Sequence, residues 1–240
     1  MIHGLSTAGL GPPDPELALI QHAGYVQALE ACGLEVTVLE ADEDYPDSTF
    51  VEDAALLTRS CAIITKPGAP SRRGETDSIR EVLSEFYSEI EEIRSPGTVE
   101  GGDIMMVGDH FYIGLSKRTN LEGARQVIDH LTRHGLSGST VSFGELLHLK
   151  TGIAYLENDT IAATGEYLEI EEFRKFKRIE IDADEAYAAN CLWLNGTVLV
   201  AAGFPKAAGK IAAAGYPIIA VEVSEFRKLD GGLSCLSLRI

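Results

Sequence analysis

Apolar and polar residues along this chain follow a repeating order of two short strand-like segments, a segment of helical period and a further strand-like segment. The two strand-like segments of a repeat flank a turn sequence such as Gly108-Asp109 or Asn195-Gly196, and such pairs favour tight hairpins. The predicted hairpins cover residues 54–58 with 61–65, 104–107 with 111–115, 153–156 with 160–163, and 191–194 with 198–201. The predicted helices cover residues 14–32, 75–87, 121–133, 170–176 and 206–214, and single strands are predicted at 34–39, 178–181, 218–223 and 236–240.

Two of the predicted helices carry clear start signals. Asp14 precedes Pro15, an order that combines a capping side chain with a proline in the first turn. Asn120 stands directly before the helical segment at 121–133, where its side chain can accept a hydrogen bond from a free backbone N–H group. These signals predict helix starts at Asp14-Pro15 and after Asn120.

The hairpins recur at intervals of roughly 40–50 residues, and each is followed by a helix and one more strand. This period indicates radial repetition of one small α/β unit. A doubly wound sheet would lack the hairpins. Because no linker, low-complexity segment or change in composition divides the chain, we expect a single domain over residues 1–240.

The composition is that of a globular protein, with 45% hydrophobic and 24% charged residues. The net charge is −17, from 20 basic and 37 acidic residues. This charge argues against nucleic acid or an anionic membrane as a partner. It would suit a cationic small molecule, although many acidic proteins are merely soluble.

The four cysteines form no Cys-x-x-Cys pair and have no spacing that suits zinc. Cys32, Cys61 and Cys191 have apolar neighbours and are expected to be buried thiols in a reducing cytoplasm. The sequence has no basic-then-apolar signal segment and no apolar run of about 18 residues. We therefore expect a cytoplasmic protein.

Cys235 differs from the other cysteines because it follows the turn sequence Asp230-Gly231-Gly232, which would present it at the edge of a strand. His148 lies in the apolar segment Leu147-His148-Leu149. Glu100 begins the segment Glu100-Gly101-Gly102-Asp103, whose glycines allow the backbone to approach a ligand closely. A thiol, an imidazole and a carboxylate are the groups that covalent thiol catalysis needs.

Other polar segments add candidate binding residues. Asp47, Glu52 and Asp53 place three carboxylates within seven residues. Arg72 and Arg118 lie on two separate loops, and two guanidinium groups can hold one carboxylate through paired hydrogen bonds. Each of these segments, taken alone, is also compatible with a solvated loop. His148 or Cys235, taken alone, is also compatible with a buried residue that has only a structural role.

Taken together, these segments resemble the dimethylarginine dimethylaminohydrolases, a family of guanidine-modifying enzymes in the pentein superfamily. The matching segments are residues 46–53 (PDSTFVED), 64–73 (ITKPGAPSRR), 100–103 (EGGD), 114–120 (GLSKRTN), 147–150 (LHLK), 189–191 (ANC) and 230–235 (DGGLSC). The resemblance spans nearly the whole chain, and its specificity comes from the segments jointly.

The resemblance implies an α/β-propeller of five ββαβ units around a central polar channel. It also implies hydrolysis of Nω-methylated L-arginine, both monomethylarginine and asymmetric dimethylarginine, to L-citrulline and methylamine or dimethylamine. The expected route is covalent thiol catalysis through an S-alkylthiouronium intermediate. Neither a metal nor an organic cofactor is expected, since each proton transfer can be assigned to a side chain.

By the family pattern Cys235 is the nucleophile, His148 the general acid and base, and Glu100 the carboxylate that binds and orients the guanidinium. The implied substrate-binding residues are Leu5, Asp47, Glu52, Asp53, Arg72, Arg118 and Leu229. Among these, Asp53 shares the guanidinium, and Asp47 with the backbone carbonyls near Leu5 and Leu229 holds the α-amino group. Arg72 and Arg118 take the α-carboxylate.

The chain departs from the family pattern at its start. Family members begin with a strand about a dozen residues before the position of Gly4 and Leu5, and no such strand precedes Gly4 in this sequence. We expect either that the start is truncated or that the first unit is incomplete. We expect the absence of this first N-terminal strand to leave an exposed sheet edge and to loosen the segment that carries Leu5.

Several alternatives remain at this point. The same thiol chemistry would serve a deiminase that acts on arginine or another guanidine and releases ammonia, and an amidinotransferase uses related chemistry. A binding protein on the same scaffold, or an enzyme that has lost its activity, would also carry the fold. The expected partner is a small guanidino molecule, and the chain is compatible with a homodimer.

Overall fold

The computed structural model describes residues 1, 3–144 and 147–240, which separate into two compact units. The first unit contains residues 1–49 and 152–234, and the second contains residues 50–151 and 235–240. Each unit holds two three-stranded sheets. The prediction that residues 1–240 form a single domain stays a prediction.

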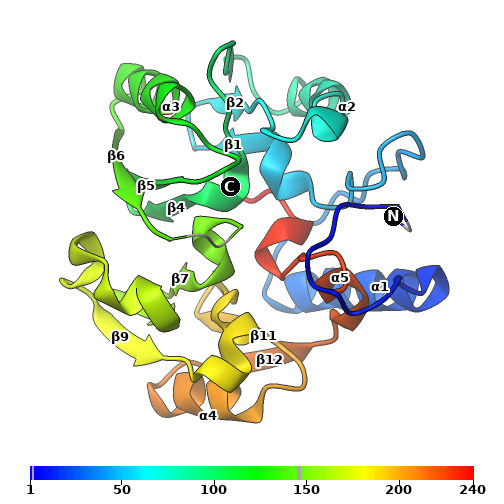
Figure 1. Ribbon diagram of the computed structural model, residues 1–240, viewed down its shortest axis with the longest axis vertical. Coiled ribbons are helices and arrows are strands. Elements are labelled where there is room, and N and C mark those ends of the chain that lie inside the picture. Colours follow the sequence, from blue (N-terminus) through cyan, green and yellow to red (C-terminus); the bar gives the residue numbers. More distant parts are fainter. Residues whose placement is uncertain (2, 145–146) are drawn as a thin grey trace. The chain divides into compact units, whose positions relative to one another are not determined.

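The second unit is built from two ββαβ repeats, visible in Figure 1 as short sheets with a helix between their second and third strands. The first repeat consists of β1 (Ala55–Leu57), β2 (Ala62–Ile64), α2 (Glu75–Leu83) and β3 (Ile90–Glu92). The second consists of β4 (Ile104–Val107), β5 (His110–Leu115), α3 (Leu121–Arg133) and β6 (Ser137–Ser142). The 3₁₀ helices η1 (Val51–Ala54), η3 (Gly101–Asp103) and η4 (Leu149–Thr151) precede or follow the repeats, and η2 (Pro70–Arg72) lies within the first repeat, between β2 and α2.

The first unit contains the other two repeats. One consists of β7 (Ile153–Tyr155), β8 (Thr160–Ala163), the 3₁₀ helices η5 (Gly165–Glu169) and η6 (Glu171–Phe173), and β9 (Lys177–Glu180). The other consists of β10 (Leu192–Leu194), β11 (Thr197–Ala201), α4 (Pro205–Ala213) and β12 (Ile218–Val221). The unit also includes α1 (Pro15–Ala31), η7 (Ala183–Ala189) and α5 (Ser224–Arg227).

All four repeats share one strand arrangement. The first two strands are antiparallel, and the third strand lies parallel to the second, which therefore occupies the centre of the sheet. The central strands β2 and β8 are buried along their whole length. The predicted order of strand, strand, helix and strand is therefore confirmed as an α/β fold with four three-stranded sheets in the described residues.

Local chemistry explains the hairpins and helix starts. In the β10–β11 turn, Asn195 has φ 47° and Gly196 has φ 90°, the left-handed conformations that an Asn-Gly hairpin turn requires. Asp14 caps α1 by accepting hydrogen bonds from the Glu16 and Leu17 N–H groups. Asn120 caps α3 by accepting from the Gly123 N–H group at 2.7 Å, as predicted.

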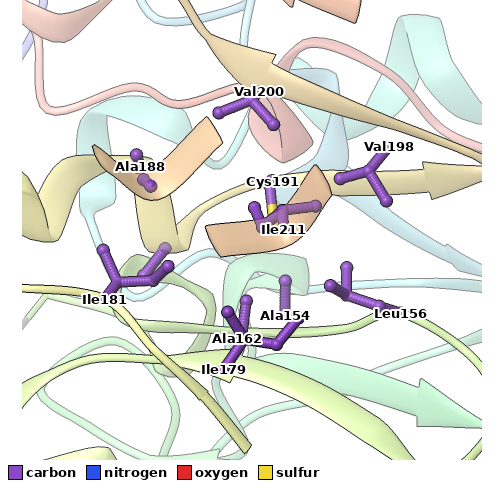
Figure 2. Close-up of a cluster of buried hydrophobic side chains, with 12 residues drawn as sticks. Ala154, Leu156, Ala162, Ile179, Ile181, Ala188, Cys191, Val198, Val200 and Ile211 are labelled. Atoms are coloured by element: carbon purple, nitrogen blue, oxygen red, sulfur yellow. The ribbon is translucent and has the colours of Figure 1, made fainter. Parts of the chain in front are cut away.

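Each unit has its own hydrophobic core. The core of the first unit surrounds Cys191 and Ile211, and Figure 2 shows small aliphatic side chains from β7, β8, β11 and α4 around them. The second unit packs Val127 and Leu131 of α3 against Phe111 and Ile113 of the central strand β5. Among the residues that the structure describes, no helix is both long enough and apolar enough to cross a membrane.

Two strand predictions were wrong. Residues 34–39 alternate like a strand but lie in no strand, and residues 236–240 have no strand beyond the 3₁₀ helix η8 (Ser234–Leu236). An alternating pattern describes only which side chains can share a face, whereas a strand also needs a hydrogen-bonding partner. The turn that precedes Cys235 therefore leads into a 3₁₀ helix and not onto a strand edge.

Smaller differences concern element ends and edge strands. The predicted helix at 75–87 ends at Leu83, and the one at 170–176 is only the 3₁₀ helix η6. The pattern did not predict β3 or β6, which are third strands at sheet edges. The sequence of β6 is Ser-Gly-Ser-Thr-Val-Ser, which lacks the apolar alternation of a half-buried strand.

Candidate active site

A buried ion pair between Glu100 and His148 forms the centre of the site in the second unit. His148 Nε2 lies 2.7 Å from Glu100 Oε2, and the two side chains are 9% and 0% exposed. Glu100 directly precedes η3, and His148 directly precedes η4, so two short 3₁₀ helices bring the two residues together from 48 positions apart. Both residues were predicted from the sequence, and the structure brings them together.

Asp53 completes a three-residue cluster with this pair. One ligand-type atom each from Asp53, Glu100 and His148 lies within 4.8 Å of the others. Asp53 is only 3% exposed and accepts a hydrogen bond from the Gly102 N–H group at 2.9 Å. The 3₁₀ helix η1 therefore delivers the second carboxylate that the sequence predicted for the site.

The two glycines after Glu100 are required by close packing. A Cβ atom on Gly102 would lie 2.8 Å from His148 Nδ1 and 3.0 Å from Asp53 Oδ1, and one on Gly101 would lie 2.0 Å from the backbone oxygen of Glu52. No side chain fits at such distances. The glycines thus allow the backbone to contact the imidazole and the carboxylate directly, which is the close approach that the Glu-Gly-Gly-Asp segment predicted.

The carboxylates set the protonation state of the histidine. Burial by itself would lower the pKa of His148, but the negative charge of Asp53 and the hydrogen bond and charge of Glu100 outweigh it and raise the pKa to about 9. Burial would likewise raise the pKa of Glu100, and the bonds and charges of His148, Arg118 and Arg72 reverse this and lower it. At neutral pH the pair is therefore imidazolium and carboxylate.

Two arginines already provide guanidinium groups to the site carboxylates. Arg72 Nη1 donates to Asp53 Oδ2 at 2.6 Å, and its Nε and Nη2 donate to Glu75. Arg118 Nη1 donates to Glu100 Oε1 at 3.3 Å. The Arg72 side chain is 6% exposed and the Arg118 side chain 21%, so only Arg118 has ready access to solvent.

Two acidic residues of the site were not assigned a role from the sequence. Asp103 accepts from the Ser116 hydroxyl at 2.7 Å and from the Leu149 N–H group at 2.9 Å, which holds the segment next to His148. Burial raises the pKa of Asp103, opposed by the positive charge of His148. The sequence signal that could have identified Asp103 was its place in the Glu-Gly-Gly-Asp segment. Glu75 begins an ordinary amphipathic helix, and nothing in its sequence context marks it as the partner of Arg72.

Glu52 lies next to Asp53 but contacts different groups. Its Oε1 accepts from Lys150 Nζ at 2.6 Å and from Arg239 Nη2 at 2.8 Å. Lys150 and Arg239 were not predicted as site residues. Lys150 is part of the Leu147–Lys150 segment that the sequence singled out, whereas Arg239 carries no local signal.

The cluster of Asp53, Glu100 and His148 has the residue types of a metal site. Its ligand atoms, however, already have cationic partners, because Arg72 neutralises Asp53 while Arg118 and the imidazolium of His148 neutralise Glu100. A divalent cation would have to displace these groups and deprotonate a histidine whose pKa is raised. The donor set therefore fits a cationic organic group better than a metal ion.

Cys235 lies on η8 and belongs to the C-terminal segment of the second unit. Cys235 is partly exposed, whereas Cys32, Cys61 and Cys191 are buried. Burial raises the pKa of the Cys191 thiol to about 12, which keeps that sulfur unreactive. The exposure of Cys235 is what a nucleophile requires.

The first unit brings together the three residues predicted to hold an α-amino group. The Leu5 N–H group donates to the Asp47 carboxylate at 3.0 Å. A Cβ atom on Gly4 would lie 2.6 Å from Asp47 Oδ1 and 3.2 Å from a methyl carbon of Leu229, so these residues surround Gly4. The segment is held further by the Ser6 hydroxyl, which donates to the Lys228 carbonyl at 2.6 Å.

The fold and this cluster define a class of protein. The structure superimposes with a TM-score of 0.89 on the N-terminal domain of ArgZ, a cyanobacterial arginine dihydrolase, over 98% of this chain and 92% of that one, at 19% identity. At that identity the likeness concerns the α/β fold alone.

A narrower assignment follows from closer relatives. A family model described as N,N dimethylarginine dimethylhydrolase, eukaryotic, matches residues 14–168. A protein of Pseudomonas aeruginosa named N(G),N(G)-dimethylarginine dimethylaminohydrolase is 55% identical over 240 residues, which cover 100% of this chain and 94% of that protein. The chain belongs to the dimethylarginine dimethylaminohydrolase family.

Other relatives agree. A Streptomyces coelicolor protein of the same name is 36% identical over 228 residues, covering 95% of this chain and 87% of that protein. A crystal structure of the Pseudomonas aeruginosa enzyme, described as a cysteine-to-serine mutant complexed with citrulline, superimposes with a TM-score of 0.98 over 100% of this chain and 94% of that one. A histidine-to-glycine variant of a dimethylarginine dimethylaminohydrolase, described as an adduct with S-methyl-L-thiocitrulline, has the same TM-score and coverage.

Proposed function

We propose that this protein hydrolyses Nω-methylated L-arginine to L-citrulline and methylamine or dimethylamine. The observation that carries the proposal is the buried Glu100–His148 pair with Asp53 beside it, found in a chain that is 55% identical to a dimethylarginine dimethylaminohydrolase. The pair supplies a proton for an amine leaving group, and the two carboxylates supply negative charge for a guanidinium.

The site is chemically matched to a guanidinium. Asp53 and Glu100 each bind the guanidinium of an arginine side chain, Arg72 and Arg118 respectively. A substrate guanidinium offers the same donors to the same acceptors. We assign Glu100 and Asp53 as the carboxylates that bind the substrate and hold its carbon in place for attack.

The first half of the reaction forms a bond to sulfur and breaks one to nitrogen. In our assignment the Cys235 thiolate attacks the guanidinium carbon and gives a tetrahedral adduct. His148, protonated at neutral pH because its pKa is raised to about 9, donates its proton to the methylated nitrogen. The C–N bond breaks, dimethylamine leaves, and an S-alkylthiouronium remains on Cys235.

In the second half of the reaction, His148 acts as a general base instead of a general acid. His148, now neutral, removes a proton from water as the water oxygen attacks the thiouronium carbon. Collapse of the second adduct breaks the C–S bond, returns the thiolate of Cys235 and releases citrulline. The net reaction consumes one water for each dimethylarginine. The hydroxyl proton of the second adduct is lost as citrulline leaves and is taken up by the released amine, which becomes dimethylammonium.

The amino-acid end of the substrate is assigned to other residues. We propose that Asp47 and the backbone carbonyls of Leu5 and Leu229 hold the α-amino group, and the close packing of these residues around Gly4 supports this. For the α-carboxylate the greater exposure of Arg118 favours it over Arg72, which is enclosed by Asp53 and Glu75. Glu52 stays a predicted substrate contact, although its carboxylate binds Lys150 and Arg239.

The remaining expectations concern the architecture and setting of the enzyme. The four repeats support the proposal of a propeller of five ββαβ units around a polar channel. A reducing, cytoplasmic location stays a prediction. Homodimer formation stays a prediction.

Citrulline release tests the proposal against its main alternative. We expect asymmetric dimethylarginine and monomethylarginine to give citrulline, and arginine at least about 100-fold less at equal concentration, since a site shaped for a methylated nitrogen binds the transition state for its loss preferentially. Arginine as the better substrate, with ammonia released, would establish the deiminase instead. The comparisons do not favour that outcome.

Mass spectrometry of the intact protein tests the covalent step. Rapid quenching during turnover should reveal an adduct on the peptide that contains Cys235. His148→Gln should lower the rate of citrulline release by about 100-fold or more and stall the enzyme at or before this adduct, because no proton reaches the leaving amine. His148→Gln with unchanged turnover would remove histidine from the mechanism.

A further inference from the structure

Glu52 and Asp53 are adjacent carboxylates on η1, but they serve two separate ion-pair groups. Asp53 faces Arg72 and the Gly102 backbone, whereas Glu52 Oε1 accepts from both Lys150 and Arg239. The Glu52 side chain is 4% exposed, and those of Lys150 and Arg239 are 17% and 25% exposed. One buried oxygen atom thus receives two cations.

The two cations come from the chain segments that carry the proposed catalytic side chains. Lys150 lies two residues after His148 on η4, and Arg239 lies four residues after Cys235 in the C-terminal segment. Glu52 itself precedes Asp53 on η1. The carboxylate of Glu52 therefore joins the backbone segments of Asp53, His148 and Cys235 without being one of these groups.

The segment that carries Cys235 needs such an attachment. In the described structure residues 235–240 form no strand, so no sheet hydrogen bonds determine their position. The segment is held by side chains, with Leu238 packed against the cluster that includes Ala54 and Ile79. Arg239 Nη1 also donates to the Ser237 carbonyl at 2.7 Å, which ties the arginine to its own segment before it reaches Glu52.

Glu52 is itself fixed. Its backbone oxygen is packed so tightly against Gly101 that a Cβ atom there would lie 2.0 Å away. This contact restrains the backbone at Glu52, and the side chain itself is buried, at 4% exposed, with both cations on one carboxylate oxygen. A buried carboxylate with two cationic partners is suited to holding the segments of those partners in place.

We propose that Glu52 is a positioning residue that sets the Cys235 segment and the His148 segment relative to the guanidinium-binding carboxylates, through Arg239 and Lys150. The activity part of this inference rests on the proposed function, whereas the anchoring part does not. Misplacing a reacting group by about 1 Å can cost about 100-fold in rate, so the ion pairs affect turnover without contacting substrate.

The experiment combines steady-state kinetics with hydrogen exchange on the full chain. Arg239→Gln and Lys150→Gln remove one cation each, Glu52→Gln removes the shared charge, and Arg239→Lys keeps a cation. Arg80→Gln is the matched control, because it breaks a surface ion pair with Glu92 in the same unit, where the side chains are 38% and 49% exposed. Citrulline formation from dimethylarginine gives kcat and KM, and peptide-resolved exchange reports residues 235–240 and 147–151.

We expect Arg239→Gln and Glu52→Gln to lower kcat about 10-fold or more, with KM changed less than about 3-fold. Exchange in 235–240 should rise at least about 5-fold in both variants, consistent with local release of the segment. Lys150→Gln should have the corresponding effect on 147–151. Arg239→Lys should recover most of kcat, and Arg80→Gln should match the wild type in both readouts.

Two results would overturn the proposal. A raised KM with unchanged kcat in Glu52→Gln would make Glu52 a direct substrate contact, and unchanged exchange in Arg239→Gln would show that the ion pair anchors nothing. A wild-type protein that forms no citrulline from dimethylarginine would instead refute the proposed function, and the exchange data would still decide whether Glu52 holds the C-terminal segment.

Discussion

The two units are built from the same kind of repeat, but their buried acidic residues have different hydrogen-bonding partners. In the first unit, Glu185 is 7% exposed and accepts from the backbone N–H groups of Lys206 and Ala207, at the start of α4. In the second unit, Glu100 is fully buried and faces the side chains of His148 and Arg118. A buried acid that serves backbone groups supports the fold, whereas one that serves ionisable side chains can take part in chemistry.

The interiors differ in the same way. The core around Cys191 is hydrocarbon, built from Ala, Val, Ile and Leu side chains that need no polar partner (Figure 2). The second unit has a hydrocarbon core as well, but it also contains Asp53, Arg72, Glu75, Glu100 and His148 in one ion-pair network. Buried charges seldom stabilise a fold, since their desolvation costs about as much free energy as their pairing returns. This network therefore marks the region of the proposed chemistry.

The largest effect is expected from cysteine-to-serine substitutions, one in each unit. Cys235→Ser should reduce citrulline formation below detection, at least about 10⁴-fold, because a serine hydroxyl is a poor nucleophile toward a guanidinium. Its melting temperature should stay within about 2 °C of the wild type, given the partial exposure of Cys235.

Cys191→Ser is the matched variant. It places a hydroxyl in the hydrocarbon core and should cost about 1–3 kcal/mol of the free energy of unfolding, with kcat per folded molecule unchanged. Urea titration and the citrulline assay measure the two quantities. Retained activity in Cys235→Ser would end the thiol mechanism.

The next largest effects are expected at Arg72 and Arg118, for which the sequence predicted the same role, binding of the α-carboxylate. Arg72→Ala leaves Asp53 and Glu75 buried without their cation and should cost about 3–5 kcal/mol of the free energy of unfolding. Arg118→Ala should cost less stability than Arg72→Ala, because Glu100 keeps His148 as a cationic partner. It should raise KM about 10-fold or more, because α-carboxylate binding is nearly equal in ground and transition states. Denaturant titration and kinetics on both variants check this. If Arg72→Ala raised KM without lowering the free energy of unfolding, Arg72 would be a direct substrate contact.

The Glu100–His148 pair should make stability depend on alkaline pH. The pKa of His148 is about 9 in the folded protein against an ordinary value of 6.5, so its ion pairs stabilise the fold fully below pH 6.5. That stabilisation is lost as pH rises through 9, and its size is at most about 3 kcal/mol. Unfolding free energies from pH 6 to 10, compared between wild type and His148→Gln, isolate this contribution. Parallel curves for the two proteins would contradict the raised pKa.

The smallest effect is expected in the first unit. Glu185→Gln keeps an acceptor for the backbone at the start of α4 but removes the negative charge that favours a helix N-terminus. We expect a loss of about 0.5–1 kcal/mol in the free energy of unfolding and no change in kcat. A fall in kcat would mean that the acid has a catalytic role and that the contrast between the units is wrong.

Local signals along the chain predicted most of the repeats. Hairpin turns such as Asn195-Gly196 and helix caps such as Asn120 act within a few residues, so their effect is visible in the sequence. The edge strands β3 and β6 were missed, and the predicted strands at 34–39 and 236–240 were wrong. In each of these cases the state of the segment depends on whether another strand lies beside it, which a local pattern does not contain.

The sequence by itself determined the kinds of groups available to this protein: one thiol after a tight turn, one histidine among leucines, and a carboxylate before two glycines. Only the tertiary structure decided which of the charged groups meet. It paired Glu100 with His148 across 48 positions, enclosed Arg72 between Asp53 and Glu75, and joined Glu52 to Lys150 and Arg239. The reason is physical, because turns and caps are satisfied by neighbours in the chain, whereas a buried charge must find its partner wherever the packed backbone brings one.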